Sequence, residues 1–177
     1  MKKVYVLGAM LLASLLLMSG TARAEVKVGD DVPEFKLVGS DGKTYTSEQF
    51  KGKQAIVIAW FPKAFTGGCT KECKSMREAG ETLKQFEVAY FTASCDDVKK
   101  NMDFAASLDL DYPILSDPDK SFAKALGCLS PRGVSSRWTY YIGKDGKILH
   151  IDKSVKTASH GADIAAQMEK LGIAKKN

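Results

Sequence analysis

The sequence predicts an α/β domain with a mixed central sheet, helices on both faces and an N-terminal β-hairpin. Two apolar runs rich in β-branched residues, over 54–61 and 88–93, are typical of parallel strands buried on both faces. A helical pattern follows each run, and this alternation requires parallel pairing with right-handed crossovers. Asp-Gly turns near both ends of the domain predict additional antiparallel hairpins, so the sheet is expected to be mixed.

Local sequence patterns predict the strands and helices of the first half of the domain. Strands over 35–38 and 43–45 flank Asp41-Gly42, and Thr46 with Gln49 three residues later predicts a capping box for a short helical turn. After the strand over 54–61, residues at spacings of four and three define one helix face, which comprises Cys69, Cys73, Met76, Gly80 and Leu83.

The second half continues the alternation and ends in a hairpin and a helix. Asp117-Pro118 predicts an N-cap and a first-turn proline for a helix that runs through Leu126. Gly172 is a good terminator for the last helix. The other expected elements are a helix over about 97–108, strands over 112–115, 137–142 and 147–152, and a helix over about 159–171. This order predicts a thioredoxin-like fold.

Residues 1–24 have the organisation of a cleavable export signal. Two lysines precede an apolar run over 4–18, and Ala22-Arg23-Ala24 supplies the small residues of an A-x-A cleavage site. The run is shorter than the roughly 20 apolar residues that a membrane-spanning helix needs. We therefore expect cleavage after Ala24, a single domain over 25–177, and a periplasmic or secreted mature protein.

Composition and charge narrow the function classes. The chain has 177 residues and a net charge of +5, but three basic residues and no acidic ones lie in 1–24, so the mature 153 residues carry +2. With no basic-aromatic stripe, we expect neither nucleic-acid binding nor, after signal cleavage, membrane binding. Four cysteines remain in a compartment expected to be oxidising: Cys69, Cys73, Cys95 and Cys128.

Cys69 lies where a central strand is expected to pass into a helix. The carboxyl edge of an open α/β sheet is where ligands bind, and the free amides and dipole of a first helical turn stabilise a thiolate. The hydroxyl of Thr66 can face the same point, and Pro62, which has no N–H, would shield it from water. The alternative for one cysteine at a helix start is a small buried apolar residue.

The motif around this cysteine is Pro62-x-x-x-Thr66-x-x-Cys69, with Glu72 three residues later. It resembles the active-site signature of the peroxiredoxin family (AhpC/TSA superfamily), and the closest variant is the Q-type, or bacterioferritin-comigratory-protein-like, group. The resemblance covers nearly the whole mature chain in family order. The other matching stretches are Val32-Pro33-x-Phe35-x-Leu37, Ser94-x-Asp96, residues 115–119 and residues 137–148.

The resemblance implies a thiol-dependent peroxidase that reduces hydrogen peroxide or small organic hydroperoxides through a cysteine sulfenic acid, without metal, haem or flavin. Cys69 would be the peroxidatic cysteine, Thr66 would hydrogen-bond peroxide and thiolate, and Pro62 would cover the pocket. Arg137 would stabilise the thiolate and polarise the peroxide, and Glu72 would orient polar groups around the site. A thioredoxin-like protein is the expected reductant; the preferred peroxide and the oligomeric state stay open.

The cysteine that resolves the sulfenic acid also stays open. Cys73 is the candidate, but it lies four residues after Cys69, where the Q-type variant usually has five. Residues one turn apart in an intact helix are about 5–6 Å apart at Cβ, which is too far for a disulfide, so this pairing requires the first turn to unwind. The two glycines before Cys69 would help. The alternatives are a core-facing Cys73, resolution by Cys95, Cys128 or an external thiol, and a Cys95–Cys128 pair.

A Sco-type copper chaperone is the alternative function. Such a protein is also thioredoxin-like and exported, and two thiolates spaced as Cys69 and Cys73 with a distant histidine would suit copper. However, the position where its histidine is expected holds Ser135-Ser136-Arg137, and the proline expected after the second cysteine is missing. Surface or helix-capping roles suffice for His150 and His160.

Overall fold

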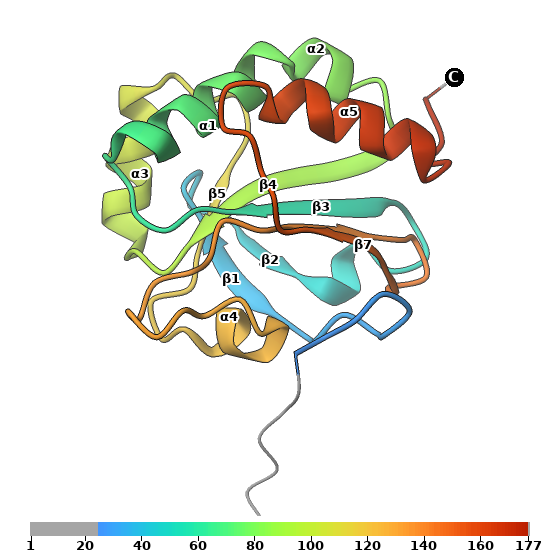
Figure 1. Cartoon of the computed structure of the whole chain (residues 1–177), viewed down its shortest axis with the longest axis horizontal. Helices are drawn as coiled ribbons and strands as arrows, with labels where there is room; N and C mark the ends of the chain where they lie inside the picture. The colour runs from blue at the N-terminus through green and yellow to red at the C-terminus, as the bar shows by residue number, and fades with distance from the viewer. Residues whose placement is uncertain (1–24, 177) are drawn as a thin grey trace, which may run out of the picture.

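The computed structural model describes residues 25–176, so the export signal predicted over 1–24 lies outside the described residues. Within them, seven strands form one sheet in the order β2-β1-β5-β4-β3-β6-β7 (Figure 1). β3, β4 and β5 pair in parallel and the other neighbours are antiparallel, which confirms the mixed sheet. The strands are β1 (Lys36–Gly39), β2 (Thr44–Thr46), β3 (Ala55–Trp60), β4 (Val88–Ser94), β5 (Ile114–Ser116), β6 (Thr139–Ile142) and β7 (Ile148–Asp152).

Helices cover both faces of this sheet, as predicted. In Figure 1, α1, α2 and α5 lie together above the sheet and α4 lies below it. The helices are the 3₁₀ turn η1 (Ser47–Gln49), α1 (Gly67–Glu78), α2 (Gly80–Leu83), α3 (Val98–Ser107), α4 (Ser121–Leu126) and α5 (His160–Lys170).

The central strand β3 contributes side chains to two separate cores, because successive residues of a strand point to opposite faces. Val57 and Ala59 belong to a buried cluster that includes Met76 of α1 and Met168 of α5. All six residues of β3 are buried, so the prediction of a strand covered on both faces is confirmed.

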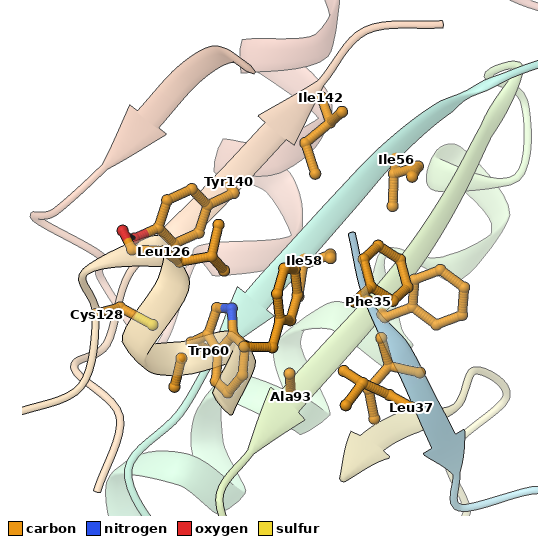
Figure 2. Packing of buried hydrophobic residues seen from close by; sticks show 14 of the residues in the cluster. Phe35, Leu37, Ile56, Ile58, Trp60, Ala93, Leu126, Cys128, Tyr140 and Ile142 are labelled. Carbon is orange, nitrogen blue, oxygen red and sulfur yellow. Dashed lines mark hydrogen bonds between the residues drawn. The ribbon is translucent and has the colours of Figure 1, made fainter. Parts of the chain in front are cut away.

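The opposite face of the sheet carries the second core. Ile58 and Trp60 of β3 lie there with Leu126 of α4 and Tyr140 of β6 (Figure 2). The hydroxyl of Tyr140 donates to the main-chain carbonyl of Leu126 at 3.1 Å, which ties α4 to the sheet. Because β3 is packed from both sides, its carboxyl end is a rigid support for the loop that follows.

The start of α4 differs from the prediction. Residues 117–120 form a turn and the helix begins at Ser121, so Asp117 is not the N-cap and Pro118 is not in the first turn. The residue before the helix, Lys120, has a φ of 64°. The Asp117 carboxylate still accepts a hydrogen bond from the N–H of Ala123 at 2.8 Å. Asp117 therefore caps α4 from a position outside the helix. The sequence identified the capping residue correctly but placed the start of the helix too early.

The turns agree with the sequence-based prediction more closely than the start of α4 does. Gly42 and Gly146, the second residues of the two Asp-Gly pairs, have φ values of 79° and 84° in the left-handed region that glycine adopts without strain. The main-chain N–H of Thr46 donates to the Gln49 side chain at 3.0 Å, as the predicted capping interaction requires. No helix in the described part of the chain is long and apolar enough to cross a membrane.

Candidate active site

Cys69 lies at the carboxyl edge of the sheet, in the first turn of α1. β3 ends at Trp60, the loop over 61–66 follows, and α1 begins at Gly67, so Cys69 is the third residue of the helix. The N–H groups of a first turn have no partner within the helix and carry its positive dipole end. The thiol is only 1% exposed and packs with Phe61 and Phe104. Cys69 therefore combines a buried position with a positive electrostatic environment.

Arg137 brings a guanidinium to this thiol from the segment just before β6. Its Nη2 donates to Cys69 Sγ at 3.4 Å, and its Nη1 forms an ion pair with Oε2 of Glu72. Burial alone would lower the pKa of Arg137, but Glu72 and Cys69 act the other way and the net shift is upward. A Cβ placed on Gly68 would lie 3.3 Å from Nη2, so the guanidinium covers the first turn of α1 closely.

Glu72 is fully buried, and its second oxygen faces a histidine. Oε1 of Glu72 lies 3.0 Å from Nδ1 of His160, the first residue of α5, and that ring is 1% exposed. Both carboxylate oxygens of Glu72 therefore face side chains from other elements, Arg137 and His160. The expectation of a surface or capping role for His160 is wrong, because the ring is buried, its partners lie on other elements and no local pattern indicates them.

The loop between β3 and α1 is held by contacts from distant segments. The N–H of Ala64 donates to Asp96 Oδ2 at 2.8 Å, and the hydroxyl of Ser135 donates to the carbonyl of Phe61 at 2.7 Å. Phe65 has a φ of 63°, which is costly for a residue with a side chain, and its ring lies 5.0 Å from that of Phe104. Asp96 belongs to the Ser94-x-Asp96 motif of the sequence, and in the structure it holds the main chain of this loop at Ala64.

Pro62 and Thr66, the other two residues of the signature, lie in this loop. Pro62 is half-buried and Thr66 is exposed. The hydroxyl of Thr66 donates to the carbonyl of Lys63 at 2.9 Å, while its oxygen keeps a lone pair for another donor. Thr66 directly precedes α1 and is its N-cap residue. The signature residues thus lie on one loop and one helical turn, at the edge where ligands bind.

Cys73 lies one turn further along α1 and has no exposed surface. Burial, followed by the negative charge of Glu72, raises the pKa of the Cys73 thiol well above its ordinary value. The carbonyl of Cys73 accepts a hydrogen bond from the Tyr112 hydroxyl at 2.9 Å. Cys69 and Cys73 are both free thiols here. In the intact helix Cys73 is thus a core thiol whose burial disfavours the thiolate.

Cys95 and Cys128 belong to the opposite core. Cys128 is buried beside Trp60 and Tyr140 (Figure 2), and Cys95 is half-buried at the edge of the same cluster. Burial, then Asp117, raises the pKa of Cys95 to about 11. Burial, then the neighbouring Cys95, raises the pKa of Cys128 as well. Neither thiol belongs to the cluster around Cys69.

Comparisons with known proteins identify the family of this chain. The model of the AhpC/TSA family matches residues 28–151. Peroxiredoxin Bcp of Escherichia coli K12 is 30% identical over 142 residues, which cover 76% of this chain and 90% of that protein. The structure of peroxidoxin BcpB from Mycobacterium tuberculosis has a TM-score of 0.73 and 28% identity, and covers 82% of this chain and 97% of that one. Xylella fastidiosa PrxQ has a similar fold, with a TM-score of 0.77 at 21% identity over 84% of this chain and 99% of that one.

The chain belongs to the AhpC/TSA family. Its relatives include peroxiredoxins of the Bcp type, and its function is that of a thiol peroxidase in antioxidant defence. The thioredoxin-like fold is also confirmed. The copper-chaperone alternative is not supported by these relatives. The ring nitrogens of His160 face Glu72 and Thr139, and within residues 25–176 no three potential ligands are grouped as a metal site.

Proposed function

We propose that Cys69 is the peroxidatic cysteine and that it reduces hydrogen peroxide or a small organic hydroperoxide. The thiolate attacks one peroxide oxygen, the O–O bond breaks, and the product is Cys69 sulfenic acid. The departing oxygen leaves as hydroxide or alkoxide and takes up a proton to give water or an alcohol. Peroxide is reduced and the thiolate is oxidised by two electrons in the same step.

The observation that carries this proposal is the contact between Arg137 Nη2 and Cys69 Sγ at the start of α1. A fixed cation stabilises the thiolate before the reaction and negative charge on the departing oxygen during it, and such electrostatic stabilisation is strongest where water is excluded. Glu72 holds the other side of the guanidinium. The lone pair of Thr66 is available to a bound peroxide, and Pro62 limits access of water to the pocket.

We further propose that Cys73 resolves the sulfenic acid and that a thioredoxin-like dithiol protein reduces the resulting disulfide. Attack by the Cys73 thiol on Cys69 sulfenic acid forms the S–S bond and releases water. The burial of Cys73 and the spacing of the pair support a mechanism in which the first turn of α1 unwinds before this step. The reductant then supplies two electrons and two protons and returns both thiols.

The site of action is proposed to be the periplasm or the cell exterior, with a mature chain that begins at Glu25. The support is the organisation of residues 1–24 as an export signal. N-terminal sequencing of protein from the extracytoplasmic fraction tests this. An intact Met1 in a cytoplasmic fraction would contradict it.

The test of the catalytic assignment is peroxide consumption by the mature protein with a thioredoxin-type reductant, followed by intact mass. We expect Cys69→Ser to lose turnover completely. Cys73→Ser should consume one equivalent of peroxide and then carry a stable sulfenic mass, and a second equivalent should convert this to the overoxidised sulfinic mass. Cys95→Ser is the matched control and should turn over as the wild type does. Full activity in Cys69→Ser would end the proposal, and unchanged turnover in Cys73→Ser would assign resolution to another thiol.

A further inference from the structure

A network of polar contacts continues from the Cys69 site between α1, α5 and the start of β6. Arg137 faces Oε2 of Glu72, and Oε1 of that carboxylate lies 3.0 Å from His160 Nδ1. The other ring nitrogen, Nε2, lies 2.8 Å from the hydroxyl oxygen of Thr139. Glu72 comes from α1, His160 from α5 and Thr139 from β6. The contacts thus join three elements behind the reactive cysteine.

Burial makes the contact with His160 important for Glu72. The side chains of Glu72 and Thr139 have no exposed surface, and His160 is 1% exposed. A buried carboxylate is costly unless both of its oxygens have partners. In the described part of the chain, Glu72 Oε1 and His160 Nδ1 have no conventional hydrogen-bond partner, and they face each other at 3.0 Å. His160 is therefore the group that can satisfy this oxygen.

The proton positions follow from the same geometry. With hydrogen on Nδ1, a neutral His160 donates to the carboxylate, and Nε2 accepts from the Thr139 hydroxyl. The other tautomer would place a nitrogen lone pair against a carboxylate oxygen, which is repulsive. The carboxylate of Glu72 thus selects the tautomer with hydrogen on Nδ1, and we assign the Nδ1–H form on this basis. The Thr139 hydroxyl can serve as the matching donor to Nε2.

Gly161 explains how His160 reaches this position. A Cβ on Gly161 would lie 2.3 Å from the main-chain oxygen of Ser75 and 2.6 Å from the Cβ of Ala79. The N–H of Gly161 donates to the Ser75 hydroxyl at 3.1 Å. The first turn of α5 therefore lies directly against α1, at a distance that only glycine permits. This close approach places the preceding residue, His160, beside Glu72.

We propose that His160 is a positioning residue for the peroxidase reaction, acting through Glu72 on Arg137 and so on Cys69. The inference rests on the proposed role of Cys69. His160 holds one carboxylate oxygen so that the other faces Arg137 Nη1, which leaves Nη2 directed at the thiolate. The side chain of Arg137 is 23% exposed, so a displaced guanidinium could turn toward water. Loss of the donor at position 160 would weaken the cation at the thiolate without removing any group that touches peroxide.

The test compares two substitutions at this position. His160→Phe keeps a planar ring but removes the donor, whereas His160→Asn places an amide N–H close to the position of Nδ1. Hydrogen bonds to charged groups are among the stronger ones in proteins, so we expect His160→Phe to slow the oxidation of Cys69 by peroxide about tenfold, which corresponds to about 1.4 kcal/mol. His160→Asn should stay within about threefold of the wild type. His150→Phe, at the chain's other histidine, is the matched control and should have no effect.

A second readout separates positioning from a purely structural role. The ultraviolet absorbance of the Cys69 thiolate, followed against pH in proteins with the other three cysteines replaced by serine, needs no peroxide. We expect the thiolate of His160→Phe to form at higher pH than that of the wild type, and His160→Asn to restore the wild-type curve. Wild-type curves and rates in both variants would overturn the proposal. So would equal slowing in both variants with wild-type curves, since that indicates only structural damage.

Thr139→Val keeps the measurement decisive if His160→Phe does not fold. It removes the hydroxyl that holds Nε2 and leaves the histidine in place, and we expect about threefold slower oxidation with a shifted thiolate curve. An unchanged rate and curve in that variant would overturn the proposal. Failure of the proposed function would be distinct, because Cys69→Ser would then still consume peroxide whatever the residue at position 160.

Discussion

At the residue scale, the guanidinium of Arg137 contacts two partners, Glu72 and Cys69. Nη1 faces the buried carboxylate of Glu72, and Nη2 donates to Cys69 Sγ. A lysine in the same place would offer a single point charge, whereas the planar guanidinium presents donors in fixed directions. One side of the group is thus anchored, and in the proposed mechanism the other side stabilises the thiolate and the departing oxygen.

Arg137→Met should therefore slow the oxidation of Cys69 by about 100-fold, because it removes the cation and keeps much of the side-chain length. The measurement is the second-order rate of reaction with hydrogen peroxide by stopped flow. Arg132→Met, at an exposed arginine of the preceding loop, is the control and should change the rate less than twofold. Equal rates in the two variants would show that Arg137 does not contribute to the oxidation of Cys69.

The first turn of α1 has two tasks at the scale of the element. Folded, it places Cys69 against Arg137; in the proposed mechanism, unwinding of this turn lets Cys69 meet Cys73. Gly67 and Gly68 lower the free-energy cost of unwinding this turn, because glycine favours a helix less than alanine by about 1 kcal/mol. A Cβ at Gly67 would have no atom within 4 Å, whereas a Cβ at Gly68 would press on Arg137.

Gly67→Ala should consequently slow formation of the Cys69–Cys73 disulfide by up to about fivefold, the equivalent of about 1 kcal/mol. Oxidation of Cys69, followed in the same stopped-flow trace, should be unchanged and serves as the internal control. Gly68→Ala provides the contrast, because it should also disturb the first step. Disulfide formation at the wild-type rate in Gly67→Ala would contradict a mechanism that requires unwinding.

The β1–β2 hairpin offers a test of electrostatics away from the site. The hydroxyl of Tyr45 donates to Asp41 Oδ2 at 2.8 Å, and burial together with this carboxylate raises the pKa of Tyr45 to about 12. Folding thus favours the protonated phenol. The contribution to stability is fully present below pH 10, the ordinary value, and is lost as the pH rises toward 12.

We expect the free energy of unfolding to fall between pH 10 and 12 less steeply in Tyr45→Phe than in the wild type. Tyr45 is only half-buried, so solvent screening limits the difference to about 1 kcal/mol or less. Urea unfolding at several pH values measures it, and comparison between the two proteins cancels the titration of lysines. Parallel curves would show that Tyr45 titrates alike in the folded and unfolded chains.

At the scale of the whole molecule, the fold was predictable because its main signals are local. The apolar runs of β3 and β4 and the Asp-Gly turns each fix one element, and the parallel crossovers follow from their order. The boundary of α4 was not predictable, because Asp117 caps the helix across a turn that contains Lys120 in the left-handed region. Sequence patterns identify a capping residue better than the path between it and the helix.

The residues of the site differ in the same way, since those in a local motif could be predicted and those brought together by tertiary packing could not. Cys69, Thr66 and Pro62 occur in one short motif, so they were identifiable together. His160 was not identifiable, because its contacts are with Glu72 and Thr139, which are distant in the sequence. These residues meet His160 only when α5 packs on α1 through Gly161. Buried polar contacts between elements are a property of the tertiary structure, and a histidine at a helix start gives no sign of them.

The most direct test of the central claim is to identify the first residue that peroxide oxidises. Reduced Cys73→Ser protein is treated with one equivalent of hydrogen peroxide and a sulfenic-acid-specific label, and the labelled peptide is found by mass spectrometry. Protein without peroxide is the control. We predict that the label lies on Cys69. A label on Cys95 or Cys128 with Cys69 unmodified would contradict the account.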